Sequence, residues 1–128
     1  MDSGIRTIGG LIVVVLVACA VFFVAMPPKA QPEGPDNVIY FFYDENSTHC
    51  QNVMPFMANM TKKYPGANIR MLEIVHNGTN REIYASVHER LNRVSPGVPE
   101  VVVGKVILVG DANIPDQLEL LIKKRLNQ

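Results

Sequence analysis

The feature that most constrains this chain is an apolar run of 19 residues, Ile8 to Met26, which contains no charged side chain. An α-helix rises about 1.5 Å per residue, so the run extends over about 28 Å, close to the roughly 30 Å hydrocarbon core of a bilayer. Arg6 precedes the run, and Pro27 and Pro28, which interrupt helices, follow it. We therefore predict a transmembrane helix over residues 8–26, after an N-terminal tail of residues 1–7.

Two other interpretations of the apolar run are a cleaved signal peptide and a lipoprotein signal. A cleaved signal peptide has a shorter apolar region, of about 7 to 15 residues, and ends at a small-residue cleavage site. Leu16 to Cys19 resembles the lipobox of prokaryotic lipoproteins, in which the cysteine carries the lipid. However, residues 20–26 stay apolar, whereas a lipidated cysteine is normally followed by a polar tether. The sequence favours the transmembrane helix, with the membrane as its partner.

Residues 27–37 (PPKAQPEGPDN) are rich in proline, glycine and charge, and they predict a linker. Pro-rich segments extend about 3.1 Å per residue, so this linker holds a following domain up to roughly 30 Å from the membrane. The charges that flank the apolar run leave its orientation nearly balanced. Three Asn-X-Ser/Thr triplets fit a translocated domain, and they begin at Asn46, Asn59 and Asn77. We therefore expect a single-pass membrane protein with its domain outside the cytoplasm.

Charge and cysteine content narrow the function of the remaining residues. The chain carries 12 basic and 12 acidic side chains, and its only basic cluster, Lys123 to Arg125, lies in a predicted amphipathic helix. This pattern argues against nucleic-acid binding. The two cysteines, Cys19 and Cys50, are not a pair suited to an internal disulfide, because Cys19 lies within the apolar run. We expect one small domain that is stabilised by packing.

Hydrophobic periodicity predicts strands and helices in alternation after the linker. Val38 to Tyr43 is a continuous β-branched and aromatic run, which is typical of a strand buried on both faces. The other predicted strands are residues 68–75, 98–103 and 105–109, and the predicted helices are residues 48–64, 81–94 and 114–126. The order is βαβαββα, in which the first βαβ unit is parallel and the last two strands form a hairpin. We predict an α/β domain with a mixed four-stranded sheet.

Two segments resemble the thioredoxin-like family. Tyr40 to Pro55 (YFFYDENSTHCQNVMP) is similar to its active-site segment, in which a strand leads into a Cys-x-x-Cys motif at the start of a helix. A proline often follows the second cysteine of that motif by five residues, as Pro55 follows Cys50 here. Gly97 to Glu100 (GVPE) resembles the loop with a cis proline that leads into the family's hairpin. The resemblance implies a thioredoxin-like fold over residues 38–128.

The motif departs from the family at its reactive position. It reads Ser47-Thr48-His49-Cys50, so Ser47 replaces the attacking cysteine and Cys50 takes the place of the buried resolving one. Phe41 stands about where thioredoxins keep a buried acid. Thiol exchange requires a thiolate, which a serine hydroxyl cannot replace. The sequence therefore excludes a dithiol cycle within this chain.

Two functions remain open after this departure. In the first, Cys50 alone exchanges disulfides with a protein or small thiol, aided by the helix dipole and by a charged His49, although burial opposes ionisation. In the second, the domain is redox-inactive and binds a peptide or protein segment. The resemblance implies that the backbone of Val98, before a cis Pro99, pairs with such a segment beside Ser47.

Other chemical sites have weak support in the sequence. Four potential metal ligands lack the spacing of a metal site within one element, and they are His49, Cys50, His76 and His88. We expect no metal and no cofactor, and we expect His88 on a helix surface. Met54, Met57 and Met60 follow helical spacing and are expected in the core. Ser47 and His49 lack an evident orienting acid, so a hydrolase site is not predicted.

Overall fold

A computed structural model of the protein describes residues 35–128. The predicted transmembrane helix over residues 8–26, the tail of residues 1–7 and most of the linker of residues 27–37 lie outside these described residues. No helix in residues 35–128 is long and apolar enough to cross a membrane.

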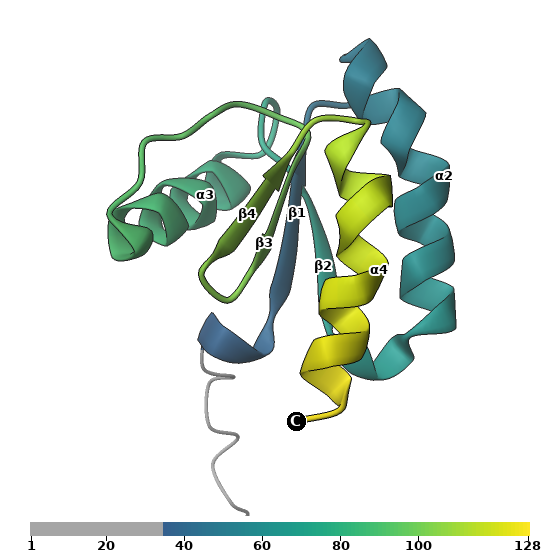
Figure 1. The fold of residues 1–128 in the computed structure, drawn as a ribbon. Coiled ribbons are helices and arrows are strands. Elements are labelled where there is room, and N and C mark those ends of the chain that lie inside the picture. The colour runs from purple at the N-terminus through teal and green to yellow at the C-terminus, as the bar shows by residue number, and fades with distance from the viewer. Residues whose placement is uncertain (1–34) are drawn as a thin grey trace, which may run out of the picture. The chain divides into compact units, whose positions relative to one another are not determined.

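The described chain folds as an α/β domain with one four-stranded sheet (Figure 1). The strands are β1 (Ile39–Tyr43), β2 (Ile69–Glu73), β3 (Glu100–Val103) and β4 (Val106–Val109). The helices are α2 (Thr48–Lys63), α3 (Gly78–Leu91) and α4 (Asn113–Leu126), with short 3-10 helices η1 (Pro35–Asn37) and η2 (Pro65–Ala67). The predicted βαβαββα order is confirmed.

The sheet is mixed and has the strand order β2-β1-β3-β4. Strand β1 is parallel to β2, with Tyr43 opposite Glu73, and antiparallel to β3, with Phe42 opposite Glu100. Strands β3 and β4 form the predicted hairpin. This topology is consistent with a thioredoxin-like fold.

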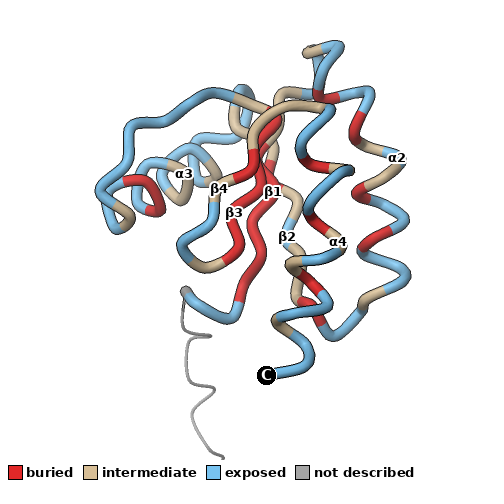
Figure 2. The backbone as a smooth tube through the Cα atoms, in the orientation of Figure 1, coloured by how far each residue is buried: buried red, intermediate tan, exposed pale blue. Residues whose placement is uncertain are grey.

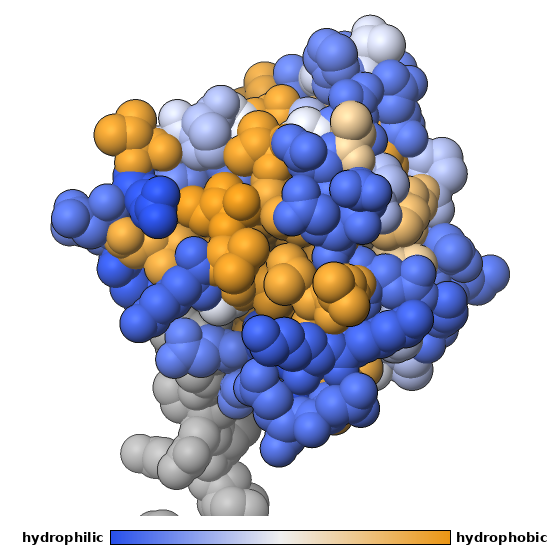
Figure 3. Space-filling model, in the orientation of Figure 1, coloured by the Kyte–Doolittle hydropathy of each residue, from blue (hydrophilic) through white to orange (hydrophobic). Residues whose placement is uncertain are grey.

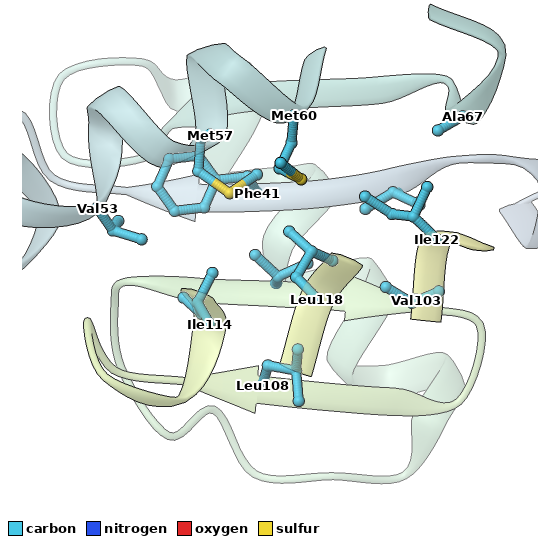
Figure 4. Close-up of a cluster of buried hydrophobic side chains, with 12 residues drawn as sticks. Phe41, Val53, Met57, Met60, Ala67, Val103, Leu108, Ile114, Leu118 and Ile122 are labelled. Atoms are coloured by element: carbon cyan, nitrogen blue, oxygen red, sulfur yellow. The ribbon is translucent and has the colours of Figure 1, made fainter. Parts of the chain in front are cut away.

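Two apolar cores lie on the two faces of the sheet, because β1 is central and buried on both sides (Figure 2). Phe41 belongs to the core beneath α2 and α4, together with Met57 and Leu118 (Figure 4). Phe42 points to the opposite face and packs with Val87 of α3. Alternation along β1 thus distributes its aromatic side chains between both cores. The predictions of a doubly buried first strand and of core methionines in α2 are confirmed.

Three predicted boundaries shift for local reasons. Helix α3 begins at Gly78, because the Asn77 side chain accepts a hydrogen bond from the Asn80 amide and caps the helix. It ends before Asn92, whose positive φ of 50° stops the helix. Strand β3 begins only at Glu100, since the preceding Pro99 has no amide proton to donate.

The prediction that His88 lies on a helix surface is wrong. Its side chain is 6% exposed, and its Nε2 atom lies 2.9 Å from Oε1 of Glu100 on β3. Helix α3 turns this residue toward the sheet, where the buried carboxylate of Glu100 provides the polar partner that a buried imidazole requires.

Candidate functional site

The two motifs that resemble the thioredoxin-like family meet at one end of the sheet. Strand β1 ends at Tyr43 and leads through a short loop into α2 (Figure 1). Strand β3 runs in the opposite direction and begins at Glu100, opposite Phe42. The Val98–Pro99 peptide bond, which is cis, therefore lies beside the loop after β1. We call this end of the domain the motif end.

Ser47 occupies the N-cap position of α2. Its amide donates to the Asp44 carbonyl at 3.1 Å, and its carbonyl accepts from the Gln51 amide at 2.9 Å. The hydroxyl makes no capping hydrogen bond, although serine commonly caps a helix in this way. The half-buried hydroxyl of Ser47 is therefore available to another polar group.

Cys50 is enclosed in the first turn of α2. Its side chain has no exposed surface, and its thiol is free. The sulfur accepts a hydrogen bond from the Asp44 amide at 3.4 Å. A thiol must contact a disulfide sulfur in order to exchange with it. The closed environment of Cys50 prevents that contact unless the loop between β1 and α2 moves.

His49 is held by a partner that sequence reasoning missed. Its side chain is 74% exposed, and its Nδ1 donates to Oδ2 of Asp111 at 3.0 Å. Asn52 donates to the same oxygen at 3.0 Å. The hydrogen bond from Asn52, followed by that from His49, lowers the pKa of Asp111 below its ordinary value. No sequence pattern indicated this contact, because 62 residues separate the two partners.

A second carboxylate at the motif end is stabilised by backbone amides. Glu73, at the end of β2, accepts from the amides of Val75 at 2.8 Å and His76 at 2.9 Å. Burial alone raises the pKa of Glu73, but the hydrogen bonds from His76 and Val75 outweigh it and lower the pKa below the ordinary value. His76 also lies 3.3 Å from Glu45. These carboxylates and Asp111 exceed the positive charge of Arg81, whose guanidinium donates to the Val75 carbonyl at the same end.

Val98 leaves its backbone polar groups available at the motif end. Within residues 35–128, neither its amide nor its carbonyl makes a backbone hydrogen bond. The adjacent Pro99 differs, since its carbonyl accepts from the Gly110 amide at 3.0 Å and joins the loop to the end of the hairpin. Val98 is thus a free donor and acceptor beside a fixed neighbour. Unpaired backbone donors and acceptors are the groups through which an extended segment forms β-type pairing.

A buried polar network surrounds Glu100, the residue that follows the cis Val98–Pro99 unit. Glu100 is fully buried, and its Oε2 lies 3.1 Å from His88 Nε2 and 3.4 Å from the Tyr84 hydroxyl. Oε1 is closer to Nε2, at 2.9 Å, but makes no hydrogen bond within the described part of the chain. Burial raises the pKa of Glu100 above its ordinary value, and the nearby His88 opposes this shift.

One proton can lie between the Nε2 atom of His88 and the carboxyl group of Glu100. The Nδ1 atom of His88 lies 2.7 Å from the Tyr84 carbonyl, which can only accept, so Nδ1 carries a hydrogen. A neutral His88 therefore presents a bare Nε2 to Glu100, and the proton between them belongs either to Nε2 or to the carboxyl group. Sequence reasoning missed this network, although one acid at the start of a Val-rich strand was a signal for it.

The candidate metal ligands named from the sequence are distributed over separate places. His49 contacts Asp111, His76 contacts Glu45 and Glu73, and His88 is buried with Glu100. In the described part of the chain, no group of three or more His, Cys, Asp or Glu side chains is arranged to hold a metal ion.

No known protein family, curated protein or solved structure matches the chain.

Proposed function

We propose that this chain is a membrane-tethered, thioredoxin-like binding module that holds an extended segment of another protein against Val98. The free amide and carbonyl of Val98 beside the cis Pro99 carry this proposal. Residues 8–26 serve as the membrane anchor, and the domain lies outside the cytoplasm.

The environment of the motif cysteine supports binding over catalysis. Ser47 stands in the position of the attacking thiol, and Cys50 is fully buried. Neither residue offers an exposed thiolate, which thiol exchange requires. The half-buried hydroxyl of Ser47 and the free backbone of Val98 instead provide hydrogen-bonding groups at the same end of the sheet.

The charge of the motif end indicates which segments bind. Glu45, Glu73 and Asp111 surround this end, and hydrogen bonds keep the last two ionised to a lower pH than usual. Acidic surfaces favour basic partners and accelerate their encounter. We therefore expect the bound segment to be extended and to carry Lys or Arg.

A second function is favoured by one contact. The Asp44 amide donates to the Cys50 sulfur, so this sulfur faces the loop between β1 and α2. If the loop between β1 and α2 opens, Cys50 becomes a single-cysteine exchange site, with mixed disulfides as its products. This alternative requires Cys50, whereas peptide binding through Val98 does not.

The test is selection of a phage-displayed peptide library without cysteine against the full chain in detergent. We expect enrichment of extended, basic peptides, and equal enrichment with Cys50→Ser. Val98→Pro removes the amide donor and should abolish it. A bound peptide should also shift the NMR signal of the Val98 amide in the unsubstituted protein, which tests the site without a variant. Absence of enrichment, or its loss with Cys50→Ser, would contradict the binding function.

A further inference from the structure

The end of the domain opposite the motif end collects positive charge. The β3–β4 turn at Gly104 lies at this end, because Val103 pairs with Ile39 at the start of β1. Helix α4 also ends here with a basic last turn, and Arg90 and Arg93, at and after the end of α3, line a recess together with Lys105 of the turn. The cations that define this basal face are Arg90, Arg93, Lys105, Lys123, Lys124 and Arg125.

The net charge of the domain does not reveal this local positive charge. Residues 35–128 contain ten Lys or Arg and ten Asp or Glu, so their formal charge cancels. Glu45, Glu73 and Asp111 lie at the motif end, whereas Asp36 lines a basal recess and Glu119 pairs with Lys63 and Lys123. The six cations of the basal face outnumber the acids near them, so this end of the domain carries net positive charge.

The basal face contains two recesses lined by cations. One, of about 310 Å³, is lined by Arg90, Arg93 and Lys105 together with Leu91. The other, of about 280 Å³, is lined by Lys124 and Arg125 together with Asp36, Gln128 and apolar residues that include Val103 and Leu121. Guanidinium and ammonium groups that converge on one recess suit a phosphate group, since each supplies charged N–H donors.

Apolar side chains are exposed between these cations. Val106 follows Lys105 and is 43% exposed, and Leu126 follows Arg125 and is 46% exposed. Figure 3 shows apolar surface beside hydrophilic surface on the side that carries β4 and α4. Basic residues interleaved with apolar ones are typical of surfaces that lie in a membrane interface.

The chain enters the domain at the basal face. The Arg125 guanidinium donates to the carbonyl of Asp36 in η1, and Asp36 lines one of the two recesses. The 34 residues outside the structure, including the apolar run of residues 8–26, join the domain at this point. Eight residues lie between Met26 and Pro35, so nine steps of about 3.1 Å place the attachment point within about 28 Å of the end of the run.

We propose that the basal face docks on anionic phospholipid headgroups of the membrane that anchors the chain. The inference rests on the proposed membrane anchor. The two recesses hold headgroup phosphates, while Val106 and Leu126 enter the interface. Each Lys or Arg near an anionic surface strengthens attachment about five-fold. Docking in this way turns Val98 and Pro99 away from the bilayer and toward partners.

The experiment uses the absence of tryptophan from the chain. The full chain with Leu126→Trp is reconstituted into vesicles of phosphatidylcholine, with or without phosphatidylglycerol, in which some lipids are brominated to quench nearby tryptophan. We expect quenching and a blue shift only with phosphatidylglycerol, and their loss at high salt. Asn46→Trp, a control reporter at the motif end, should remain unquenched.

A charge substitution makes the test specific. Lys105→Glu should lower the ratio of docked to undocked Leu126→Trp protein at least five-fold, whereas Arg81→Glu, the same charge change outside the basal face, should leave it unchanged. Equal quenching without phosphatidylglycerol overturns the proposal. So does quenching that rises with the protein-to-lipid ratio, since this indicates contact between copies.

Alkaline extraction of the vesicles separates this proposal from the ones on which it rests. If alkaline pH releases the chain from the vesicles, both the membrane anchor and basal docking are overturned. Retention of the chain with an unquenched Leu126→Trp overturns docking alone, and the binding function of Val98 is then still tested by the peptide selection.

Discussion

The buried contact between His88 and Glu100 makes a quantitative prediction about stability. Substitution of His88 by Leu removes the imidazole and leaves the fully buried Glu100 carboxyl with the Tyr84 hydroxyl, at 3.4 Å, as its neighbour. At a pH high enough to ionise Glu100 in the folded domain, loss of its partner costs about 3–5 kcal/mol, because the buried carboxylate keeps its desolvation penalty. We expect His88→Leu to destabilise the domain by that amount.

This loss is large in relation to the whole domain. The 94 described residues correspond to a free energy of unfolding of about 5–14 kcal/mol. The single variant should therefore lose at least a fifth of that stability. The double variant His88→Leu/Glu100→Leu leaves no buried charge, and replacing both partners of such a pair by apolar residues is commonly neutral or stabilising. We expect its stability to be at or above that of the unsubstituted chain.

Urea unfolding followed by far-UV circular dichroism measures these differences, with the full chain in nonionic detergent. Glu89→Gln, at an exposed neighbouring position on α3, is the matched control and should change stability by less than about 0.5 kcal/mol. A loss below about 1 kcal/mol with His88→Leu would refute the reasoning. So would a double variant as unstable as the single one, because the cost would then lie in packing.

The same pair predicts the pH dependence of stability. Burial raises the pKa of Glu100 in the folded domain, so the folded state retains this proton at a pH where the unfolded chain, with an ordinary value of about 4.3, has released it. Stability from this group is therefore present below about pH 4.3 and is lost as the pH rises through the folded-state value. Relative to Glu100→Gln, the unsubstituted chain should lose stability across that window. A relative gain there would contradict the direction.

The motif end makes three further predictions. Burial raises the pKa of Glu73, but hydrogen bonds from the His76 and Val75 amides lower it overall. The stability that ionised Glu73 contributes should therefore be lost as the pH falls below about 4.3. If urea unfolding shows that Glu73→Gln loses stability in acid as steeply as the unsubstituted chain, the prediction is wrong. Ser47→Cys should form a disulfide with Cys50 under mild oxidation, as mass spectrometry of alkylated protein would detect, and two free thiols would argue against the motif alignment. Native Cys50 should react with iodoacetamide much more slowly than in urea; comparable rates would show that its burial is not maintained.

Residue patterning determined most of the architecture before any coordinates. The run Val38 to Tyr43 identified a central strand, since side chains that are apolar on both sides fit only the middle of a sheet. Helical spacing placed Met57 and Met60 in a core, and both are buried. These inferences succeed because the periods of helix and strand are local properties of the backbone. Boundaries moved by a few residues where a cap or a proline intervened, as at Asn77 and Pro99.

The candidate site was only partly visible in the sequence. Ser47, Cys50, Val98 and Pro99 were named from two motifs, and sheet register brings both motifs to one end of the domain. The spacing of the motifs along the chain did not reveal that Asp111 binds the exposed ring of His49.

By itself, the sequence determined the apolar run, the order of elements and the missing nucleophile at Ser47, because each depends on residue identity or on short-range periodicity. Only the tertiary structure decided that His88 is buried against Glu100 and that Lys105 lies beside Arg90 and Arg93. Such pairings join residues on different elements, and their free energy depends on burial and distance, which are set when helices and strands pack together.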